Sequence, residues 1–382
     1  MIQNKDIVIV STMQYHELPT RKQRIASLLS RSNRVLYIEP SSTYLAVMLH
    51  GKNNAPKPTV ETLPNLSIAT LPTILPFGLR STFIHRMNQS KILNHMKRIL
   101  ANHGFHPDIV WFYLVDYPEL VSLFPRAVVV YDCVDDHSAY PGLRSAPFVN
   151  ALEKKLVQFS DVVFATTKAL TEKLHSTDKN VFLVPNGVEF SLYQSWDGQA
   201  PTFLEDIPHP IIGYMGALKE WFDVEFILAL TKAFPNAHFV LAGPCSPGFT
   251  SQFSRHSRIH FPGSISPNKV PSWIGTFDVC LIPFLPNELT LNISPLKFFE
   301  YCAMGKPCVS IPIHQLEQYN NVAYLYRTHE EGVQMVQRAL EEKDMLKKEK
   351  RLQIAKEASW DEKLAFMLLQ IEEKLLSIKT SP

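Results

Sequence analysis

Short apolar runs that alternate with helix-type patterns are the feature that most constrains the fold of this 382-residue chain. Each run is continuously apolar, which is typical of strands buried on both faces. The runs are 7–10, 34–38, 108–112, 127–131, 161–164 and 181–184 in the first half, and 211–215, 237–241, 258–261, 278–282 and 307–311 in the second. Helical segments between buried strands predict α/β architecture with a doubly wound parallel sheet, and the pattern occurs twice.

The length of the chain fits two domains better than one. A polar segment with proline and glycine, from Pro185 to Pro210, interrupts the apolar pattern and marks the break between them. We expect a Rossmann-like domain over 1–188, a linker over 189–208, a second Rossmann-like domain over 209–359 and an amphipathic helix over 360–382. Two such domains facing each other would bind ligands in the cleft between their strand ends.

Several classes of protein are disfavoured by what the sequence lacks. No apolar run approaches the ~18–20 residues that span a bilayer, and the N-terminus leads directly into a strand rather than a signal peptide. The five cysteines form no Cys-x-x-Cys pair and several lie in apolar stretches, which favours buried free thiols in the reducing cytoplasm. Dinucleotide, Walker, zinc-protease and serine-hydrolase motifs are absent. No Asp-x-Asp pair is present either, so we expect no obligatory metal and no resident cofactor.

Charge is distributed unevenly along the chain. Residues 1–107 contain thirteen Lys and Arg against four Asp and Glu, a net charge of +9, and no acidic residue lies between Glu61 and Asp108. Within this region the stretch 80–100 has helical periodicity, with apolar positions 83, 84, 87, 92, 93, 96, 99 and 100 assigned to one stripe. Two interpretations stay open: an interfacial helix on the anionic inner face of a membrane, or a core-facing helix with a basic outer face. No helix-turn-helix, RNP or finger pattern indicates nucleic-acid binding.

The segment 287–307 predicts a binding site for a phosphorylated ligand. Ser294 and Pro295 signal the start of a helix, and Lys297 and Glu300 lie one turn apart on it. A helix N-terminus that carries a lysine attracts an anion, and a carboxylate one turn further can bind sugar hydroxyls. Phosphate followed by ribose is the arrangement of a nucleoside-diphosphate site. The alternative is a solvated ion pair on a helix surface.

Three predicted strands end in glycine, at Gly216, Gly243 and Gly263. A strand end without a side chain lets a diphosphate approach the backbone. Beside the helix that follows Ser294, these ends would form one pocket with phosphate at Gly216 and Lys297 and ribose at Glu300. Each glycine, taken alone, is equally explained by ordinary turn chemistry.

The run Ser-Pro-Leu-Lys-Phe-Phe-Glu-Tyr-Cys-Ala-Met-Gly-Lys-Pro, residues 294–307, resembles the donor-site helix of GT-B glycosyltransferases of the family-4 type. The resemblance is greatest to bacterial enzymes of teichuronic-acid and capsular polysaccharide biosynthesis. It extends over nearly the whole chain through the segments 131–138, 184–188, 213–223, 277–284 and 359–360. It implies a metal-independent transferase with two Rossmann-like domains, whose C-terminal helix crosses back to the first.

In that family the lysine matching Lys297 faces the diphosphate, and the carboxylate matching Glu300 binds the ribose of a sugar nucleotide, usually a UDP-sugar. We include in the candidate donor site Lys219, Ser264, Ser294, Pro295 and Leu296. Two positions depart from the family pattern. Asn292 stands where many members have a second glutamate, and Lys219 is the only basic residue after Gly216 where many have both Arg and Lys.

The candidate acceptor side lies in the first half of the chain. Asp135, Asp136 and His137 follow a predicted strand, where a doubly wound domain displays its chemistry, and one of them could handle the acceptor proton. Alternatively, an aspartate here caps a helix, and Asp132 is interpreted as structural. Tyr15, His16 and Arg21, in the loop after the first strand and at the start of the next helix, are the candidate acceptor-binding residues. A basic helix start in solvent is their alternative.

The predicted activity is therefore transfer of a sugar from a nucleotide donor to a carbohydrate acceptor, which we expect to be lipid-linked, during assembly of a surface polysaccharide. The predicted location is the cytoplasm, with peripheral contact to the membrane if the basic N-terminal surface binds lipid. Two alternatives remain: a sugar-nucleotide 2-epimerase on the same fold, and a non-catalytic protein with a degenerate nucleotide site.

Overall fold

The computed structural model describes residues 2–16, 20–50, 61–139, 145–175, 180–291 and 295–380. The chain divides into two compact units. Unit 1 comprises residues 1–185 and 363–382, and unit 2 comprises residues 186–362. The residues 189–208, expected to form a linker, are thus part of unit 2, where they contain two short helices.

Unit 1 is built on an eight-stranded sheet in the order β3-β4-β2-β1-β5-β6-β7-β8. Its strands are β1 (Asp6–Val10), β2 (Arg34–Glu39), β3 (Glu61–Leu63), β4 (Leu66–Thr70), β5 (Ile109–Phe112), β6 (Val128–Cys133), β7 (Val162–Ala165) and β8 (Val181–Leu183). All neighbouring pairs are parallel except β3 with β4. The carboxyl ends of the seven parallel strands therefore lie along one edge of the sheet, which we call the carboxyl edge of unit 1.

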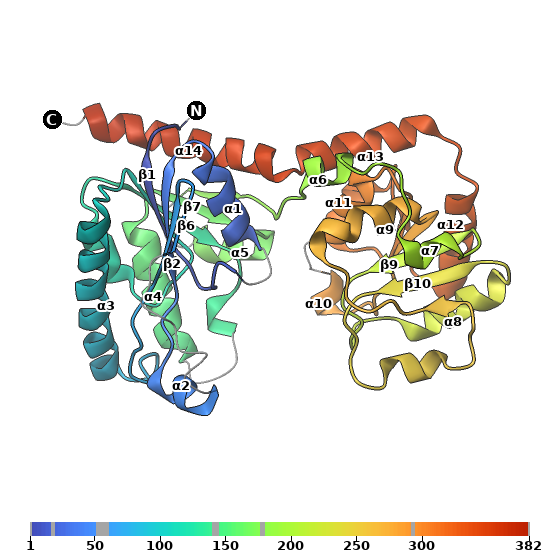
Figure 1. The fold of residues 1–382 in the computed structure, drawn as a ribbon, viewed down its shortest axis with the longest axis horizontal. Coiled ribbons are helices and arrows are strands. Elements are labelled where there is room, and N and C mark those ends of the chain that lie inside the picture. The colour runs from blue at the N-terminus through green and yellow to red at the C-terminus, as the bar shows by residue number, and fades with distance from the viewer. Residues whose placement is uncertain are drawn as a thin grey trace. The chain divides into compact units, whose positions relative to one another are not determined.

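The helices of unit 1 are α1 (Arg21–Ser30), α2 (Tyr44–His50), α3 (Thr82–His103), α4 (Ala146–Phe159), α5 (Lys168–His175) and part of α14 (Trp360–Thr380), with short 3₁₀ turns η2 (Pro118–Leu123) and η3 (His137–Ala139). One face of the sheet packs with α3 and α4 in a single apolar cluster. Figure 1 shows these two helices on one side of the sheet and α1 on the other. Both faces are covered, as continuous apolar strands require.

A buried ion pair connects distant parts of unit 1. Arg21 Nε lies 2.8 Å from Asp132 Oδ2, and both side chains are almost fully buried. The same guanidinium donates to the carbonyl of Val184 at 2.8 Å and contacts Met367 Sδ at 3.8 Å. This one side chain therefore joins α1, β6, the segment after β8 and α14.

Unit 2 contains a six-stranded, all-parallel sheet in the order β11-β10-β9-β12-β13-β14. Its strands are β9 (Ile211–Met215), β10 (His238–Ala242), β11 (Ile259–His260), β12 (Val279–Ile282), β13 (Cys308–Ser310) and β14 (Tyr324–Leu325). Its helices are α6 (Phe190–Gln194), α7 (Thr202–Glu205), α8 (Val224–Ala233), α9 (Val270–Thr276), α10 (Glu288–Leu291), α11 (Leu296–Ala303), α12 (His329–Leu340) and α13 (Met345–Glu357), with 3₁₀ turns η4 (Phe249–Phe253), η5 (Pro267–Lys269) and η6 (His314–Tyr319).

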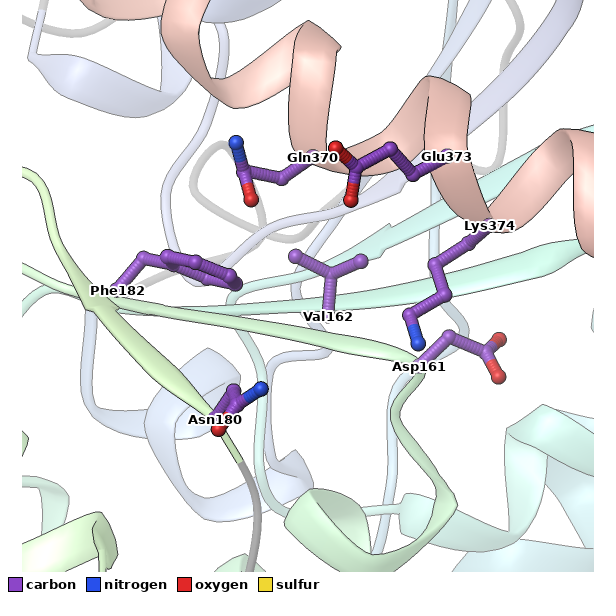
Figure 2. A pocket seen from close by; sticks show the side chains of 7 residues that line it. All are labelled: Asp161, Val162, Asn180, Phe182, Gln370, Glu373 and Lys374. Atoms are coloured by element: carbon purple, nitrogen blue, oxygen red, sulfur yellow. The ribbon is translucent and has the colours of Figure 1, made fainter.

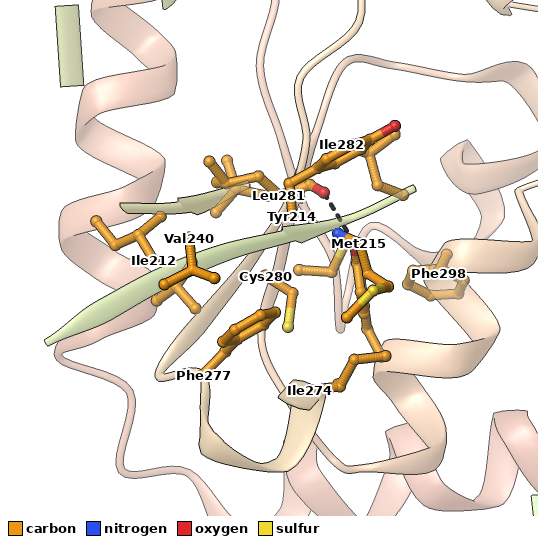
Figure 3. Packing of buried hydrophobic residues seen from close by; sticks show 14 of the residues in the cluster. Ile212, Tyr214, Met215, Val240, Ile274, Phe277, Cys280, Leu281, Ile282 and Phe298 are labelled. Atoms are coloured by element: carbon orange, nitrogen blue, oxygen red, sulfur yellow. Dashed lines mark hydrogen bonds between the residues drawn. The ribbon is translucent and has the colours of Figure 1, made fainter. Parts of the chain in front are cut away.

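The core of unit 2 forms around β9. A Cβ atom on Gly213 would lie 2.0 Å from the ring of Phe277, so the strand and this ring are in direct contact. Figure 3 shows Ile274, Phe277 and Phe298 among the buried side chains of this core. The Tyr301 hydroxyl, on α11, accepts from Met215 N and donates to the Leu281 carbonyl, each at 3.2 Å. Helix α11 is thus attached to the carboxyl ends of β9 and β12.

The prediction of two doubly wound parallel sheets is confirmed, although three short strands and α2 were not predicted. Strands β3 and β4 contain polar residues and escape a search for continuous apolar runs, and β14 has only two residues. Of the cysteines, Cys245 is exposed and the other four are buried free thiols. Among the described helices, none is long and apolar enough to cross a membrane.

The single apolar stripe expected on residues 80–100 is wrong in its first turns. The buried residues of α3 include Ile92, Met96 and Ile99, whereas Phe83 and Met87 are exposed. At 3.6 residues per turn, Phe83 lies about 180° around the helix from Ile92. Most of α3 is a core-facing helix with a basic outer face, and two large apolar side chains at its start belong to that outer face.

We predict that Arg21→Ala will destabilise unit 1 by about 3–5 kcal/mol, because Asp132 would keep a buried charge without its partner. The matched control is Arg34→Ala, since Arg34 is half exposed and pairs with Asp6 at the surface; its loss should cost about 1 kcal/mol or less. Hydrogen–deuterium exchange in increasing urea reports the strands of unit 1 separately from those of unit 2. Equal effects of the two variants would contradict the assigned role of Arg21.

Candidate functional site

The three predicted glycine strand ends lie side by side in unit 2. Gly216, Gly243 and Gly263 follow the neighbouring strands β9, β10 and β11 and all have positive φ values, of 148°, 148° and 80°. Gly216 N donates to the Ala242 carbonyl and Gly243 N donates to the Gly263 carbonyl, each at 2.8 Å. Consecutive loops after parallel strands therefore form one row of backbone at the carboxyl edge of this sheet.

The side chain of Lys297 lies against this row. A Cβ atom on Gly216 would be 2.3 Å from Lys297 Cε and 2.9 Å from its Nζ, so the lysine occupies the space that the glycine leaves open. Its Nζ lies 5.8 Å and 5.7 Å from the ring centroids of Tyr214 and Phe284. Within the described residues Lys297 makes no ion pair. The ammonium group is held by aromatic faces and glycine backbone, which leaves its charge available to an anion.

Glu300 follows Lys297 by one helical turn on α11. Burial raises the pKa of Glu300, although Lys297 and a hydrogen bond with Tyr193 act in the opposite direction. Burial also lowers the pKa of Lys297, opposed by Glu300. Both shifts mean that the charged forms lose solvation here, so each side chain gains from a ligand of complementary charge or hydrogen-bonding character.

The other predicted donor residues surround this centre less closely. Lys219 is exposed, with its Nζ 5.5 Å from the ring centroid of Trp221. Ser264 is exposed directly after Gly263, Pro295 is the buried N-cap residue of α11, and Leu296 is exposed. Ser294 and Asn292 lie outside the described residues.

Sequence reasoning missed the aromatic residues that hold Lys297 and Glu300 in place. Tyr214 precedes Gly216 by two positions, so it was interpreted only as part of a strand. Phe284 was quoted only as part of a longer segment. Tyr193 lies in the stretch expected to be a linker, where no site residue was sought. The sequence could have identified Tyr214 from its spacing to Gly216. Alternate residues of an extended segment face the same side of the sheet, so Tyr214 lies on the side that Gly216 leaves open.

In unit 1 the three candidate catalytic residues differ sharply from one another. Asp135 is exposed, Asp136 is half-buried and His137 is buried. Asp136 Oδ1 accepts from the Ser138 backbone N–H at 3.0 Å and from Lys173 Nζ at 2.8 Å. Although burial alone would raise it, these hydrogen bonds lower the pKa of Asp136 to about 2. Asp136 therefore caps η3, as the structural alternative anticipated.

A polar cluster underlies this segment. Lys173 also pairs with Glu153 at 2.9 Å, and the Tyr131 hydroxyl donates to the same carboxylate at 2.6 Å. Burial raises the pKa of Tyr131 well above its usual range. The cluster is internally satisfied and connects α5 and α4 to β6. It thus fixes the backbone from which Asp135 projects.

The side chain of Arg21, which was predicted to bind the acceptor, is buried and paired with Asp132. The structural interpretation of Asp132 fits the same pair. Tyr15 and His16 remain at the carboxyl edge of unit 1. The Tyr15 ring packs edge-on against Tyr37 with centroids 5.2 Å apart, and its backbone N–H donates to Glu39 at 2.9 Å. His16 is exposed beside it.

A pocket of about 320 Å³ in unit 1 lies away from all of these residues. Residues at the starts of β7 and β8 and on α14 line it, among them Asp161, Asn180 and Lys374 (Figure 2). Asp161 already accepts the Val129 N–H at 2.8 Å. The pocket contains no predicted site residue, and it is assigned no role. Among the described residues, no group of three His, Cys, Asp or Glu is placed to hold a metal ion.

Comparisons with known proteins show what the chain is similar to. Residues 209–342 match the family model of Glycosyl transferases group 1. TuaH of Bacillus subtilis (strain 168), a proposed teichuronic acid biosynthesis glycosyltransferase, is 26% identical over 249 residues. That match spans 61% of this chain and 62% of TuaH.

Solved structures resemble almost the whole chain. Sucrose-phosphate synthase from Thermosynechococcus elongatus has a TM-score of 0.65 at 14% identity and covers 98% of this chain and 100% of its own. HepE of Anabaena, solved with UDP and glucose, has a TM-score of 0.62 at 14% identity and covers 99% and 100%. These likenesses show that the chain has the GT-B fold of two Rossmann-like domains.

We predict that Gly243→Ala will destabilise unit 2 by about 3 kcal/mol, since its φ disfavours any side chain and the new Cβ would lie 2.0 Å from the Gly216 carbonyl oxygen. Gly263→Ala is the matched control. It also has positive φ, but no atom lies within 4 Å of the new Cβ, and it should cost only about 1 kcal/mol. Thermal unfolding of both variants would test the close backbone approach; a smaller loss for Gly243→Ala than for Gly263→Ala would contradict it.

Proposed function

We propose that this chain, whose residues 209–342 form a group 1 glycosyltransferase domain, transfers a sugar from a UDP-sugar to a carbohydrate acceptor. The contact between Lys297 and Gly216 is the observation that carries the proposal. It combines a positive charge, a helix start and exposed backbone at one point, which suits a diphosphate. HepE was solved with UDP and glucose, which supports the choice of nucleotide.

In this proposal the diphosphate lies along Gly216 and Gly243, with Lys297 beside it. As the bond between sugar and diphosphate breaks, negative charge grows on the leaving phosphate, and the preorganised lysine stabilises it. Glu300 accepts hydrogen bonds from the ribose hydroxyls. No metal is needed for these steps, because the charge is neutralised by Lys297 and the helix N-terminus. The co-substrate is the nucleotide sugar, and no resident cofactor is proposed.

Asp135 is the residue we propose to act on the acceptor hydroxyl, either as a base or by positioning it. It is exposed at the carboxyl edge of unit 1, near the start of η3. Asp136 is a poor base because its low pKa keeps it ionised and weakly proton-accepting at neutral pH. His137, which is buried, and Tyr15 and His16 are proposed to shape the acceptor site.

We infer the class of acceptor from the name of a relative. TuaH is named for teichuronic acid biosynthesis, so we propose a role in cell-surface polysaccharide assembly in the cytoplasm, with a lipid-linked saccharide as acceptor. A 2-epimerase would convert the donor without any acceptor. Measuring nucleotide release with and without a saccharide acceptor separates the two activities.

We expect Lys297→Ala to lower kcat by about 10²–10³, since it removes a charge that acts mainly on the departing diphosphate. Glu300→Gln should weaken UDP affinity by about tenfold or more through poorer ribose hydrogen bonds. Lys232→Ala, an exposed lysine on α8, is the control and should change neither value. Titration calorimetry with UDP, together with steady-state kinetics, measures both effects. Normal affinity and turnover in both site variants would refute the donor assignment.

The pH dependence of donor binding provides a separate test. Burial lowers the pKa of Lys297, so its positive charge is lost at a lower pH than that of an ordinary lysine. UDP affinity should therefore decline on the alkaline side below pH ~10.5, the usual lysine range. Lys297→Arg, which keeps its charge throughout, should remove this decline. The same decline in the arginine variant would assign it to another group.

For the acceptor side, Asp135→Asn should reduce transfer by about 10²-fold or more while leaving UDP affinity unchanged. Asp136→Asn should instead loosen the η3 turn and lower the melting temperature of unit 1, because it weakens the hydrogen bond from Lys173. Kinetics and thermal unfolding distinguish these outcomes. Full transfer activity in Asp135→Asn would remove that residue from the mechanism.

A further inference from the structure

Unit 1 exposes a group of large apolar side chains at its carboxyl edge. Met48, Leu49 and Phe83 are exposed by 81%, 72% and 71% respectively. Tyr44, Phe77 and Met87 are exposed by 44–49%. We call these six residues the apolar surface of unit 1. Single exposed apolar residues are ordinary, but a group of this size marks a contact site.

The three segments that carry these residues are joined by hydrogen bonds. Tyr44 N, at the start of α2, donates to the Ile74 carbonyl at 2.9 Å. Lys91 Nζ, on α3, donates to the Tyr44 hydroxyl at 2.9 Å. Asn88 on α3 exchanges two hydrogen bonds of 2.9 Å with the backbone of Leu75. Helix α2, the segment 74–77 and the first turns of α3 therefore form one continuous part of the molecule.

The backbone holds one of these side chains outward at a cost in free energy. Phe77 has a φ of 66°, which is unusual for a bulky residue. Strain of this kind persists only where the surroundings impose it, and it concentrates at functional positions. Here Arg80 N and Ser81 N both donate to the Phe77 carbonyl, at 2.9 Å and 3.1 Å, and fix the turn. The turn leaves the ring 44% exposed.

The segments that carry the apolar surface contain basic residues and no acidic residue. The exposed cations of the same region are Arg80, Arg86, Lys91, Lys97 and Arg98. No acidic residue occurs between Glu61 and Asp108. Protein interfaces have a polar rim, with charged residues depleted at their core. Apolar side chains on segments whose charged residues are all cationic match the interface of a bilayer that carries anionic headgroups.

We propose that the apolar surface of unit 1 docks on an anionic lipid bilayer, with Met48, Leu49, Phe77 and Phe83 inserted below the headgroups. The surrounding arginines and lysines bind the lipid phosphates. The segments that carry this surface follow β2 and β4, so they lie at the same carboxyl edge as Tyr15 and Asp135. The inference goes beyond sugar transfer, because lipid binding requires neither the donor nor turnover.

The test is co-sedimentation of the full chain with vesicles. Vesicles that contain phosphatidylglycerol in phosphatidylcholine should bind it, and pure phosphatidylcholine vesicles should bind it far more weakly. Met48→Glu/Leu49→Glu should weaken binding by about tenfold or more. Arg86→Gln should weaken it by about fivefold, and added salt should weaken it further.

The matched control is Met345→Glu/Leu346→Glu on α13. These residues form the same Met-Leu pair and are exposed by 62% and 67%, but they belong to unit 2. The control should bind vesicles as the unchanged chain does. Absence of vesicle binding, or an equal loss in both double variants, would overturn the proposal.

Self-association is the other outcome that would overturn it. A concentration-dependent dimer that Met48→Glu/Leu49→Glu dissociates, without vesicle binding, would assign the surface to a second copy of the chain. Because vesicle binding is measured without substrate, its failure would leave the proposed transferase activity untouched. Conversely, a Lys297 variant that loses sugar transfer but binds vesicles normally would show that lipid binding does not depend on the transferase activity.

Discussion

The close approach of Lys297 to Gly216 is the constraint on which the candidate donor site depends. The lysine is held where a side chain on residue 216 would have to be, so the glycine is required for space as well as for its positive φ. Gly243 is required in turn because its neighbour is the Gly216 carbonyl. Two glycines and one lysine thus depend on one another, which explains why the ends of β9 and β10 meet the first turn of α11 in the fold.

The aspartates at the end of β6 and directly after it divide into structural and exposed groups. Asp132 forms an ion pair with Arg21, and Asp136 forms one with Lys173, so both carboxylates stabilise the fold. Asp135, between them, projects into solvent. Of these three aspartates, Asp135 is the one that is exposed, on a backbone that the polar cluster beside it fixes. Sequence alone could not assign these roles, because the partners Arg21 and Lys173 are 111 and 37 positions away.

The features that the sequence predicted correctly are those with a local cause. Continuous apolar runs predict buried parallel strands, and Ser-Pro before an apolar stretch predicts a helix near residue 295. The features it missed depend on tertiary contacts. Strand β4 is recognised only by its pairing with β2. Arg21 is buried only because Asp132 lies opposite. Tyr193 reaches Glu300 only because α6 packs on α11. The wrong stripe on α3 is different, since its angles could have been calculated from the sequence.

The topology of unit 1 explains why a lipid-facing surface and acceptor chemistry would share one edge. In a parallel sheet every loop that leaves the carboxyl end of a strand emerges on the same side, whatever its sequence. The loops after β1 and β6 carry Tyr15 and Asp135. The connections after β2 and β4, which include α2 and the start of α3, carry the exposed apolar residues. A sugar acceptor that is anchored to a lipid stays near the membrane surface, so a transferase that uses one must present its acceptor site on the side that faces the membrane. If connections at one sheet edge serve both functions, the rigid strands between them fix their separation.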